Sequence, residues 1–121
     1  MQLEQVLIVS TGTRRYAVVR RNVRGLHRIT PQQPAAVLAV LLGEQAAPQE
    51  EIGIVLADTA DDAMLRVEHA DLHEQLPSLQ LPPLIAHHVH PAVRGLVLYG
   101  SELLPLVDLT RLNLQPNDGL L

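Results

Sequence analysis

Histidine is the residue type whose spacing in this sequence most readily suggests chemistry. The chain has six histidines, and three of them, His87, His88 and His90, lie close together. In an extended segment, His88 and His90 would project to the same side, as two ligands of a zinc ion could. No Cys, Asp or Glu lies within a few residues to complete a tetrahedral site. We therefore expect a histidine-rich surface loop without a bound metal.

A second histidine pair, His69 and His73, has the spacing that places two metal ligands on one face of a helix. Asp71 between them and Pro77 after them would make such a helix short. The pair therefore does not change the expectation that the protein holds no metal and no other cofactor.

Nucleophilic catalysis also lacks a plausible set of residues. The chain has no Cys, and none of Ser10, Ser78 and Ser101 lies in a Gly-x-Ser-x-Gly turn. Asp61 and Asp62 are adjacent on a polar turn, where their carboxylates point apart into water and cannot share a proton. We predict that the protein is not an enzyme.

The composition restricts both the core and the classes of partner. With two Tyr and no Phe or Trp, the core must be aliphatic, and the exposed rings that stack single-stranded bases are scarce. The net charge of −4 does not favour binding to duplex DNA, which attracts basic proteins. We expect no nucleic-acid partner.

Two features indicate a protein of the cytoplasm. The first ten residues have no basic leader, and the longest small and apolar run, residues 35–42, is far shorter than the roughly 20 residues that span a bilayer. We therefore expect a cytoplasmic protein with no direct membrane insertion.

Charge is segregated along the chain. Arginines crowd the first quarter, and acidic residues crowd the middle, at Glu44, Glu50, Glu51, Asp58, Asp61, Asp62, Glu68, Asp71 and Glu74. The two segments could face one another or be ordinary solvated surfaces, or the arginines could form a patch that faces a partner. The pattern alone leaves these alternatives open.

Strand and turn signals predict a mainly β protein. The expected strands are residues 6–9 and 16–19, which form a hairpin, residues 52–57 and 64–67, joined by a polar turn, and residues 93–99 and 103–107, which form another hairpin. Pro34 and Gly43 bracket a short helix at residues 35–42, and Asp108 could cap a second helix that runs to residue 114. The proline-rich residues 76–91 should be an extended surface loop. The chain suits a single domain, residues 1–121, with one small barrel or two.

The last hairpin carries apolar side chains on both faces of one strand. Val93, Val97 and Tyr99 lie on one side, and Leu96 and Leu98 on the other. Such a strand either lies between two layers or lines a groove that another protein fills. Arg94 in the same strand has no evident partner in the sequence. It either extends its guanidinium to solvent at an edge or contacts a binding partner.

These segments together resemble the CheW-like domain of bacterial chemotaxis signalling. Residues 6–19, with a Gly-containing turn before Tyr16-Ala17, are similar to the first hairpin of that family. Residues 91–99 and the segment Leu104-Pro105-Leu106-Val107-Asp108-Leu109 are similar to its pattern of a Pro-led Gly strand followed by Leu-Pro-x-x-Asp-Leu. The resemblance implies two intertwined SH3-like barrels that share a hydrophobic seam.

The chain also departs from that family. Between residues 29 and 41 it lacks about a strand pair, so the resemblance implies that one barrel is incomplete. Gly25 and Gly100 occupy positions where the family carries a Glu and an Arg. Their loss puts receptor coupling in doubt, and a homodimer could complete the open barrel.

The resemblance implies a non-catalytic cytoplasmic adaptor or scaffold of chemotaxis-type two-component signalling. Such a protein couples a chemoreceptor to the regulatory domain of a histidine kinase through its hydrophobic seam. The alternative is a self-associating SH3-like structural module that has lost receptor coupling. The predicted partner-binding residues are Arg20, Val23, Arg24, Arg94, Leu96 and Leu98.

Overall fold

The computed structural model describes residues 2–47, 49–57 and 63–112. Five strands close into a barrel in the order β1-β2-β9-β8-β7. Their bounds are Gln2–Thr11 for β1, Arg14–Val19 for β2, His69–Gln80 for β7, Val93–Tyr99 for β8 and Glu102–Val107 for β9. Only the β2–β9 neighbours run parallel, and the other pairs in the barrel are antiparallel.

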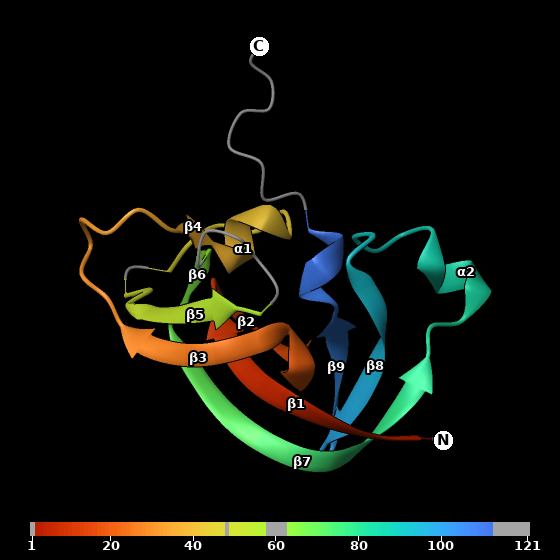
Figure 1. Cartoon of the computed structure of the whole chain (residues 1–121). Helices are drawn as coiled ribbons and strands as arrows, with labels where there is room; N and C mark the ends of the chain where they lie inside the picture. Colours follow the sequence, from red (N-terminus) through yellow and green to blue (C-terminus); the bar gives the residue numbers. More distant parts are fainter. Residues whose placement is uncertain (1, 48, 58–62, 113–121) are drawn as a thin grey trace.

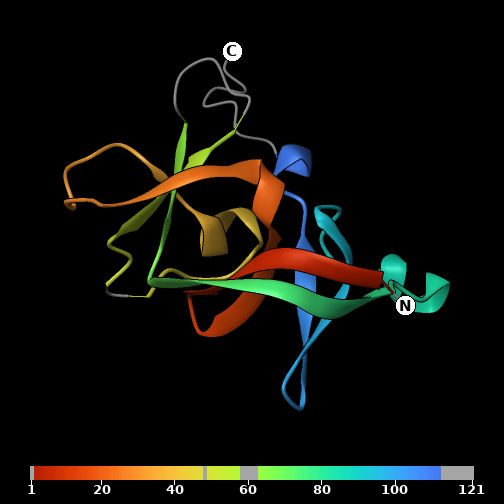
Figure 2. The same cartoon turned by 60° about the horizontal axis from the view of Figure 1, so that its bottom comes forward.

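Four further strands form a separate, open sheet in the order β3-β5-β6-β4. These are β3 (Val23–Arg28), β4 (Ala36–Val37), β5 (Ile52–Leu56) and β6 (Met64–Val67). The prediction that one barrel is incomplete is confirmed, because this sheet does not close. Figures 1 and 2 show it on one side of the barrel, with helix α2 on the opposite side.

Two hydrophobic cores result from this arrangement, and β1 contributes to both. Val6 and Ile8 point into the barrel core, whereas Leu7 and Val9 point into a shared core between barrel and open sheet. Strand β2 alternates in the same way. The hairpin of β1 and β2 is therefore buried on both faces and joins the two sheets through one apolar layer.

The helices are short, as predicted, but their bounds differ from the expected ones. Only Leu38–Leu41 forms α1, because Ala36 and Val37 pair with β6 as strand β4 first. Gly43 follows the helix with a φ of +89°, which agrees with its predicted role in ending it. Helix α2 covers Pro83–Ala86, and two 3-10 turns, η1 (Arg20–Asn22) and η2 (Leu109–Arg111), complete the elements.

The prediction that residues 76–91 form a loop is wrong in its first part. Strand β7 continues to Gln80 and includes Pro77. At Pro77 the strand pairs with Leu3 of β1, and its ladder with β8 begins one residue later at Ser78. A proline fits there because no second ladder needs its missing N–H group. Residues 83–86 of the same segment are helical, with a proline in the first turn.

The described residues contain nine strands where six were expected. Strands β3, β4 and β7 were not predicted. The capping role of Asp108 is confirmed, since its side chain accepts a hydrogen bond from the Thr110 N–H, although the helix is a 3-10 turn. The expected turn at residues 58–62, with the pair Asp61 and Asp62, and the expected end of the last helix at residue 114 lie outside the described residues.

Candidate functional site

The predicted partner-binding residues fall into two separate groups. Arg94, Leu96 and Leu98 lie on β8 of the barrel, whereas Arg20, Val23 and Arg24 lie on η1 and β3. Leu96 and Leu98 share the outer face of β8. These positions do not form one continuous site.

In the second group, the three side chains have different environments. Val23 is 5% exposed and belongs to the shared core, so its side chain is not available at the surface. The Arg20 guanidinium donates a hydrogen bond of 2.8 Å to the Val23 carbonyl and holds the start of β3. Arg24 is exposed.

Strand β8 is covered on one face only. Val97 is fully buried in the barrel core, whereas Leu98 is 38% exposed and Leu96 is half-buried. Of the two alternatives drawn from its apolar faces, burial between two layers is therefore excluded. Its outer leucines lie on the surface.

Strand register places further leucines beside these two. Leu98 pairs with Leu103 of β9, and Leu96 pairs with Leu79 of β7. Since residues directly opposite each other share a face of the sheet, these side chains form an apolar patch across three strands. Leu3 extends it to β1, because it pairs with Pro77, two residues before Leu79. We call this patch the outer barrel strip; its members are Leu3, Leu79, Leu96, Leu98 and Leu103.

The exposure of the outer barrel strip is high for leucines. Leu3 is 60% exposed, Leu79 43% and Leu103 53%. Single exposed leucines are common on proteins, but a contiguous apolar patch marks an interaction surface. Leu96 and Leu98 were predicted from the sequence. The pairing partner Leu103 could have been found from the hairpin register, whereas Leu79 and Leu3 required knowledge of strand β7.

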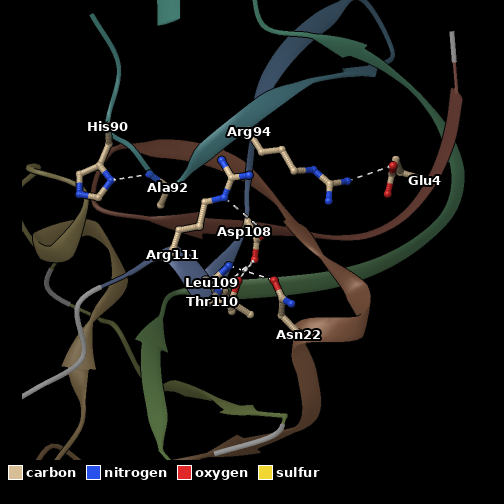
Figure 3. A network of polar contacts seen from close by, with 9 residues as sticks. All are labelled: Glu4, Asn22, His90, Ala92, Arg94, Asp108, Leu109, Thr110 and Arg111. Atoms are coloured by element: carbon tan, nitrogen blue, oxygen red, sulfur yellow. Dashed lines mark hydrogen bonds and ion pairs between the residues drawn. The ribbon is translucent and has the colours of Figure 1, made fainter. Parts of the chain in front are cut away.

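A polar groove lies beside the strip. It has a volume of about 770 Å³, and its lining includes Gln2, Glu4, Arg21, Ser78 and Arg94. The Arg94 guanidinium lies 3.0 Å from the Glu4 carboxylate, and Figure 3 shows the pair bridging β8 and β1. Both side chains are mostly buried, at 25% and 16% exposure. Arg94 therefore has a carboxylate partner within the chain, which the sequence did not reveal.

A second polar network ties the end of β9 to the open sheet (Figure 3). The Asn22 side chain accepts a hydrogen bond from the Leu109 N–H at 2.9 Å, and the Asn22 carbonyl accepts one from Ala57 at 2.8 Å. Desolvation by burial acts to raise the pKa of Asp108. Hydrogen bonds from Thr110 and the charges of Arg111 and Arg94 lower the pKa by more than burial raises it, so it lies below its ordinary value. The network holds the two sheets together and offers no reactive group.

At the opposite end of the barrel, the tip of the β8–β9 hairpin is closed by polar and aromatic contacts. Tyr99 packs edge-on against His73, with ring centroids 5.0 Å apart, and the Arg15 guanidinium lies 5.6 Å above the Tyr99 ring. Arg15 also forms an ion pair with Glu102. These contacts cover the end of the barrel core.

The histidines lie on three segments: β3, β7 and residues 87–90. His69 and His73 lie in strand β7, not on a helix, and a rise of about 3.3 Å per residue separates them too far to share one metal ion. The Nδ1 atom of His90 accepts a hydrogen bond from the Ala92 N–H at 3.0 Å (Figure 3). Among residues 2–47, 49–57 and 63–112, no group of three or more His, Cys, Asp or Glu side chains could hold a metal. In the same ranges, no helix is long and apolar enough to cross a membrane.

No family model matches the sequence, and no curated protein matches it significantly. The structure, however, is similar to the crystal structure of the scaffolding protein TtCheW from Thermoanaerobacter tengcongensis. The TM-score is 0.61 at 16% sequence identity, and the match covers 87% of this chain and 88% of the other. The predicted fold class is confirmed: the chain is mainly β, with a closed barrel, an open sheet and two short helices, and it has a CheW-like fold.

Proposed function

We propose that this chain is a non-catalytic, cytoplasmic adaptor that holds proteins together in chemotaxis-type two-component signalling. The observation that carries the proposal is the outer barrel strip on a fold shared with a scaffolding protein. Its exposed leucines suit a protein interface. The polar groups described above are paired with one another and are not arranged around a reacting centre.

The partner that we propose for the outer barrel strip is the regulatory domain of a histidine kinase. Apolar side chains near the centre of an interface can each contribute about 2 kcal/mol or more to binding. Leu98 and Leu103 pair directly with each other across β8 and β9, at the end of the strip nearest the hairpin turn. Because both side chains are exposed and lie opposite each other, we expect their removal to weaken the complex.

A matched pair of variants tests the assignment. Leu103 and Leu72 are both 53% exposed, but Leu72 lies on β7 opposite Leu7 and not on the strip. We expect Leu103→Ser to weaken binding to the kinase regulatory domain about 30-fold, as the loss of about 2 kcal/mol implies. Leu72→Ser should change it little. Surface plasmon resonance measures the affinity of both variants for the kinase domain. Equal losses of affinity would refute the strip as the interface.

Arg20 and Arg24 should affect the rate of association with the partner more than the strength of the complex. Exposed charges chiefly steer the encounter of two proteins, and salt screens them. The double variant Arg20→Glu, Arg24→Glu should therefore lower the association rate at 0.1 M salt and have less effect at 1 M. A change confined to the dissociation rate would contradict this steering role.

Coupling to a chemoreceptor is the second part of the proposed function. Gly25 lies in β3 of the open sheet, and Gly100 lies in the turn between β8 and β9 of the barrel. A Cβ atom at either position would meet no atom within 4 Å, so neither glycine is required by close packing. Binding of a receptor signalling fragment to the wild-type chain, in the presence and absence of the kinase domain, tests this coupling.

A self-associating structural module is the alternative function. The open sheet has two edge strands, β3 and β4, and exposed strand edges can pair with a second copy of the chain. Sedimentation equilibrium at tens of micromolar protein distinguishes the alternatives. A dimer that cannot bind the kinase domain would support the module and contradict the adaptor.

A further inference from the structure

Strand β3 forms an exposed edge of the open sheet. It is the end member of the order β3-β5-β6-β4, and in the part of the chain that the structure describes it pairs only with β5. The barrel is closed, and the opposite edge strand, β4, has two residues. Within the described residues, β3 is therefore the longest strand with an open edge, and Figures 1 and 2 show it along the border of its sheet.

The direction of the backbone groups follows from one hydrogen bond. The Ile29 N–H donates to the Glu51 carbonyl of the segment before β5 at 2.9 Å. In an antiparallel ladder, alternate residues direct both backbone groups to the same side. The backbone N–H and C=O groups of His27 and Gly25 therefore point to β5, whereas those of Leu26 and Arg28 point to the open edge. This edge can accept an added strand.

The side chain of Leu26 indicates where such a strand would lie. Leu26 pairs with Ile54 of β5 and shares its face of the sheet. Ile54 is fully buried in the shared core, whereas Leu26 is 44% exposed. The apolar face thus continues onto β3 without a covering layer, and an added strand with an apolar residue opposite Leu26 would cover it.

A groove runs along the same strand. Its volume is about 580 Å³, and its lining consists of Arg24, Gly25, Leu26, His27, Arg28, Ile29, Gln33, Val55 and Met64. Gly25 leaves open space beside Val55, its pairing partner. The described lining contains two arginines and no acidic residue. Arg28 also borders a separate cavity of about 120 Å³ with Glu51 and Glu68, but it forms no ion pair with any described residue.

We propose that the open edge of β3 binds an extended segment of a partner protein in which carboxylates flank a central apolar residue. Main-chain hydrogen bonds of strand addition would hold the segment. Its apolar residue would cover Leu26, and its carboxylates would pair with the arginines of β3. The site is distinct from the outer barrel strip and does not depend on the proposed kinase partner.

A second copy of this chain is a poor occupant of the same edge. Strand β3 contains Arg24 and Arg28 and no acidic residue, so two copies paired there would bring four arginines together without a carboxylate from either strand. Like charges opposite one another destabilise strand pairing. Charge complementarity therefore selects an acidic segment.

Peptide binding to the full chain tests the proposal. The probe is the acetylated, amidated peptide Thr-Glu-Thr-Val-Thr-Glu-Thr, and the matched control replaces both Glu residues by Lys. We expect the acidic peptide to shift the amide resonances of β3 in NMR spectra and to bind about tenfold more tightly than the control. No binding of the acidic peptide at millimolar concentration, or equal binding of both, would overturn the proposal.

Three variants separate strand addition from simple charge attraction. Leu26→Pro removes an edge-facing N–H group without removing a ladder bond to β5 and should abolish binding, whereas Leu26→Ala keeps that group and should bind more weakly but measurably. Gly25→Leu should fill the groove and weaken binding, with an unchanged circular dichroism spectrum. Equal binding by Leu26→Pro and Leu26→Ala would refute strand addition. A dimer of the wild-type chain that Leu26→Pro dissociates would show that a second copy occupies the edge.

Discussion

The closed barrel and the open sheet bury their strands in different ways. Every barrel strand has two neighbours, and the barrel core is purely aliphatic, built from Val6, Ile8, Ala17, Val19, Val97, Leu104 and Leu106. The open sheet lacks closing strands. The buried charged side chains of the described residues, Glu50 and Arg66, both lie in this part of the molecule.

These two charges bind loops to the open sheet. The Glu50 carboxylate accepts hydrogen bonds from the Thr11 hydroxyl at 2.9 Å and from the Gly12 and Ala47 N–H groups at 2.8 Å. It thereby ties the β1–β2 turn of the barrel to the segment that leads into β5. A carboxylate with several donors is satisfied in the protein interior.

Arg66 anchors a different loop. Its guanidinium donates to the carbonyls of Glu50, Thr30, Pro31 and Gln33, and so it holds the loop between β3 and β4. The buried core of the closed barrel is aliphatic. A sheet that lacks strands needs buried polar anchors for the loops that replace them.

The largest expected effects come from core deletions that test whether the two regions unfold together. Leu65 of the open sheet is 1% exposed and Leu104 of the barrel 5%. Leu65→Ala and Leu104→Ala should each lower the free energy of unfolding by about 2–5 kcal/mol. Because β1 and β2 contribute to both cores, each variant should unfold in one transition in urea. Two transitions, each shifted by one variant only, would show that barrel and sheet unfold independently.

The next largest effect concerns the polar anchor of the open sheet. Glu50→Ala leaves three donors without their acceptor and should cost about 1–3 kcal/mol of unfolding free energy. The neighbouring Glu51→Ala is the matched control, since Glu51 is exposed and its loss should cost little. Urea unfolding measures both. Similar losses of unfolding free energy in the two variants would show that Glu50 is not an anchor. The proposed difference in how the two regions are stabilised would then fail.

Sequence signals predicted the barrel better than the open sheet, and the reason is local. The hairpins β1–β2 and β8–β9 have aliphatic strands and turn glycines, and Gly12 and Gly100 adopt φ values of +61° and +63° that other residues disfavour. Strand β3 lacks such signals, because its sequence contains Arg24, His27 and Arg28 in place of an apolar run. Edge strands avoid the patterns by which strands are recognised.

The candidate site was predictable only where it depended on one strand. The alternation of Leu96 and Leu98 along β8 is visible in the sequence. The hydrogen bonds of Glu50 and Arg66 and the ion pair of Arg94 are not visible there. Arg66 binds carbonyls more than thirty positions away, and Glu4 is ninety positions from Arg94. Such contacts depend on strand order, which periodicity does not reveal.

A smaller effect should appear at the junction of the two regions, where Asp108 caps η2 and Leu109 enters the shared core. The pKa of Asp108 lies below its ordinary value of 3.8, so the stabilisation by its carboxylate is complete above pH 3.8 and is lost as the pH falls below it. Asp108→Asn keeps a capping oxygen but removes the charge beside Arg111 and Arg94, and it should cost about 0.2–1 kcal/mol at neutral pH. The stability gap between wild type and variant should narrow in acid, as urea titrations across this range would show. A gap that stays constant with pH would mean that the charge contributes nothing.

The smallest effects are expected from the ion pairs of the barrel, and they test whether the barrel truly lacks polar anchors. Arg15–Glu102 is about half exposed on both sides, and exposed pairs contribute about 0.2–1 kcal/mol. The cost of Glu102→Gln in unfolding free energy should therefore fall within this range and disappear at 1 M salt, where the screening length is about 3 Å.

Glu4→Gln breaks a more buried pair, but Arg94 borders a wide polar groove in which water can solvate it. Its cost should also remain below that of Glu50→Ala. If Glu4→Gln destabilises the protein as much as Glu50→Ala does, the barrel depends on a polar anchor as the open sheet does. The contrast would then lie in strand closure alone and not in how the two regions are stabilised.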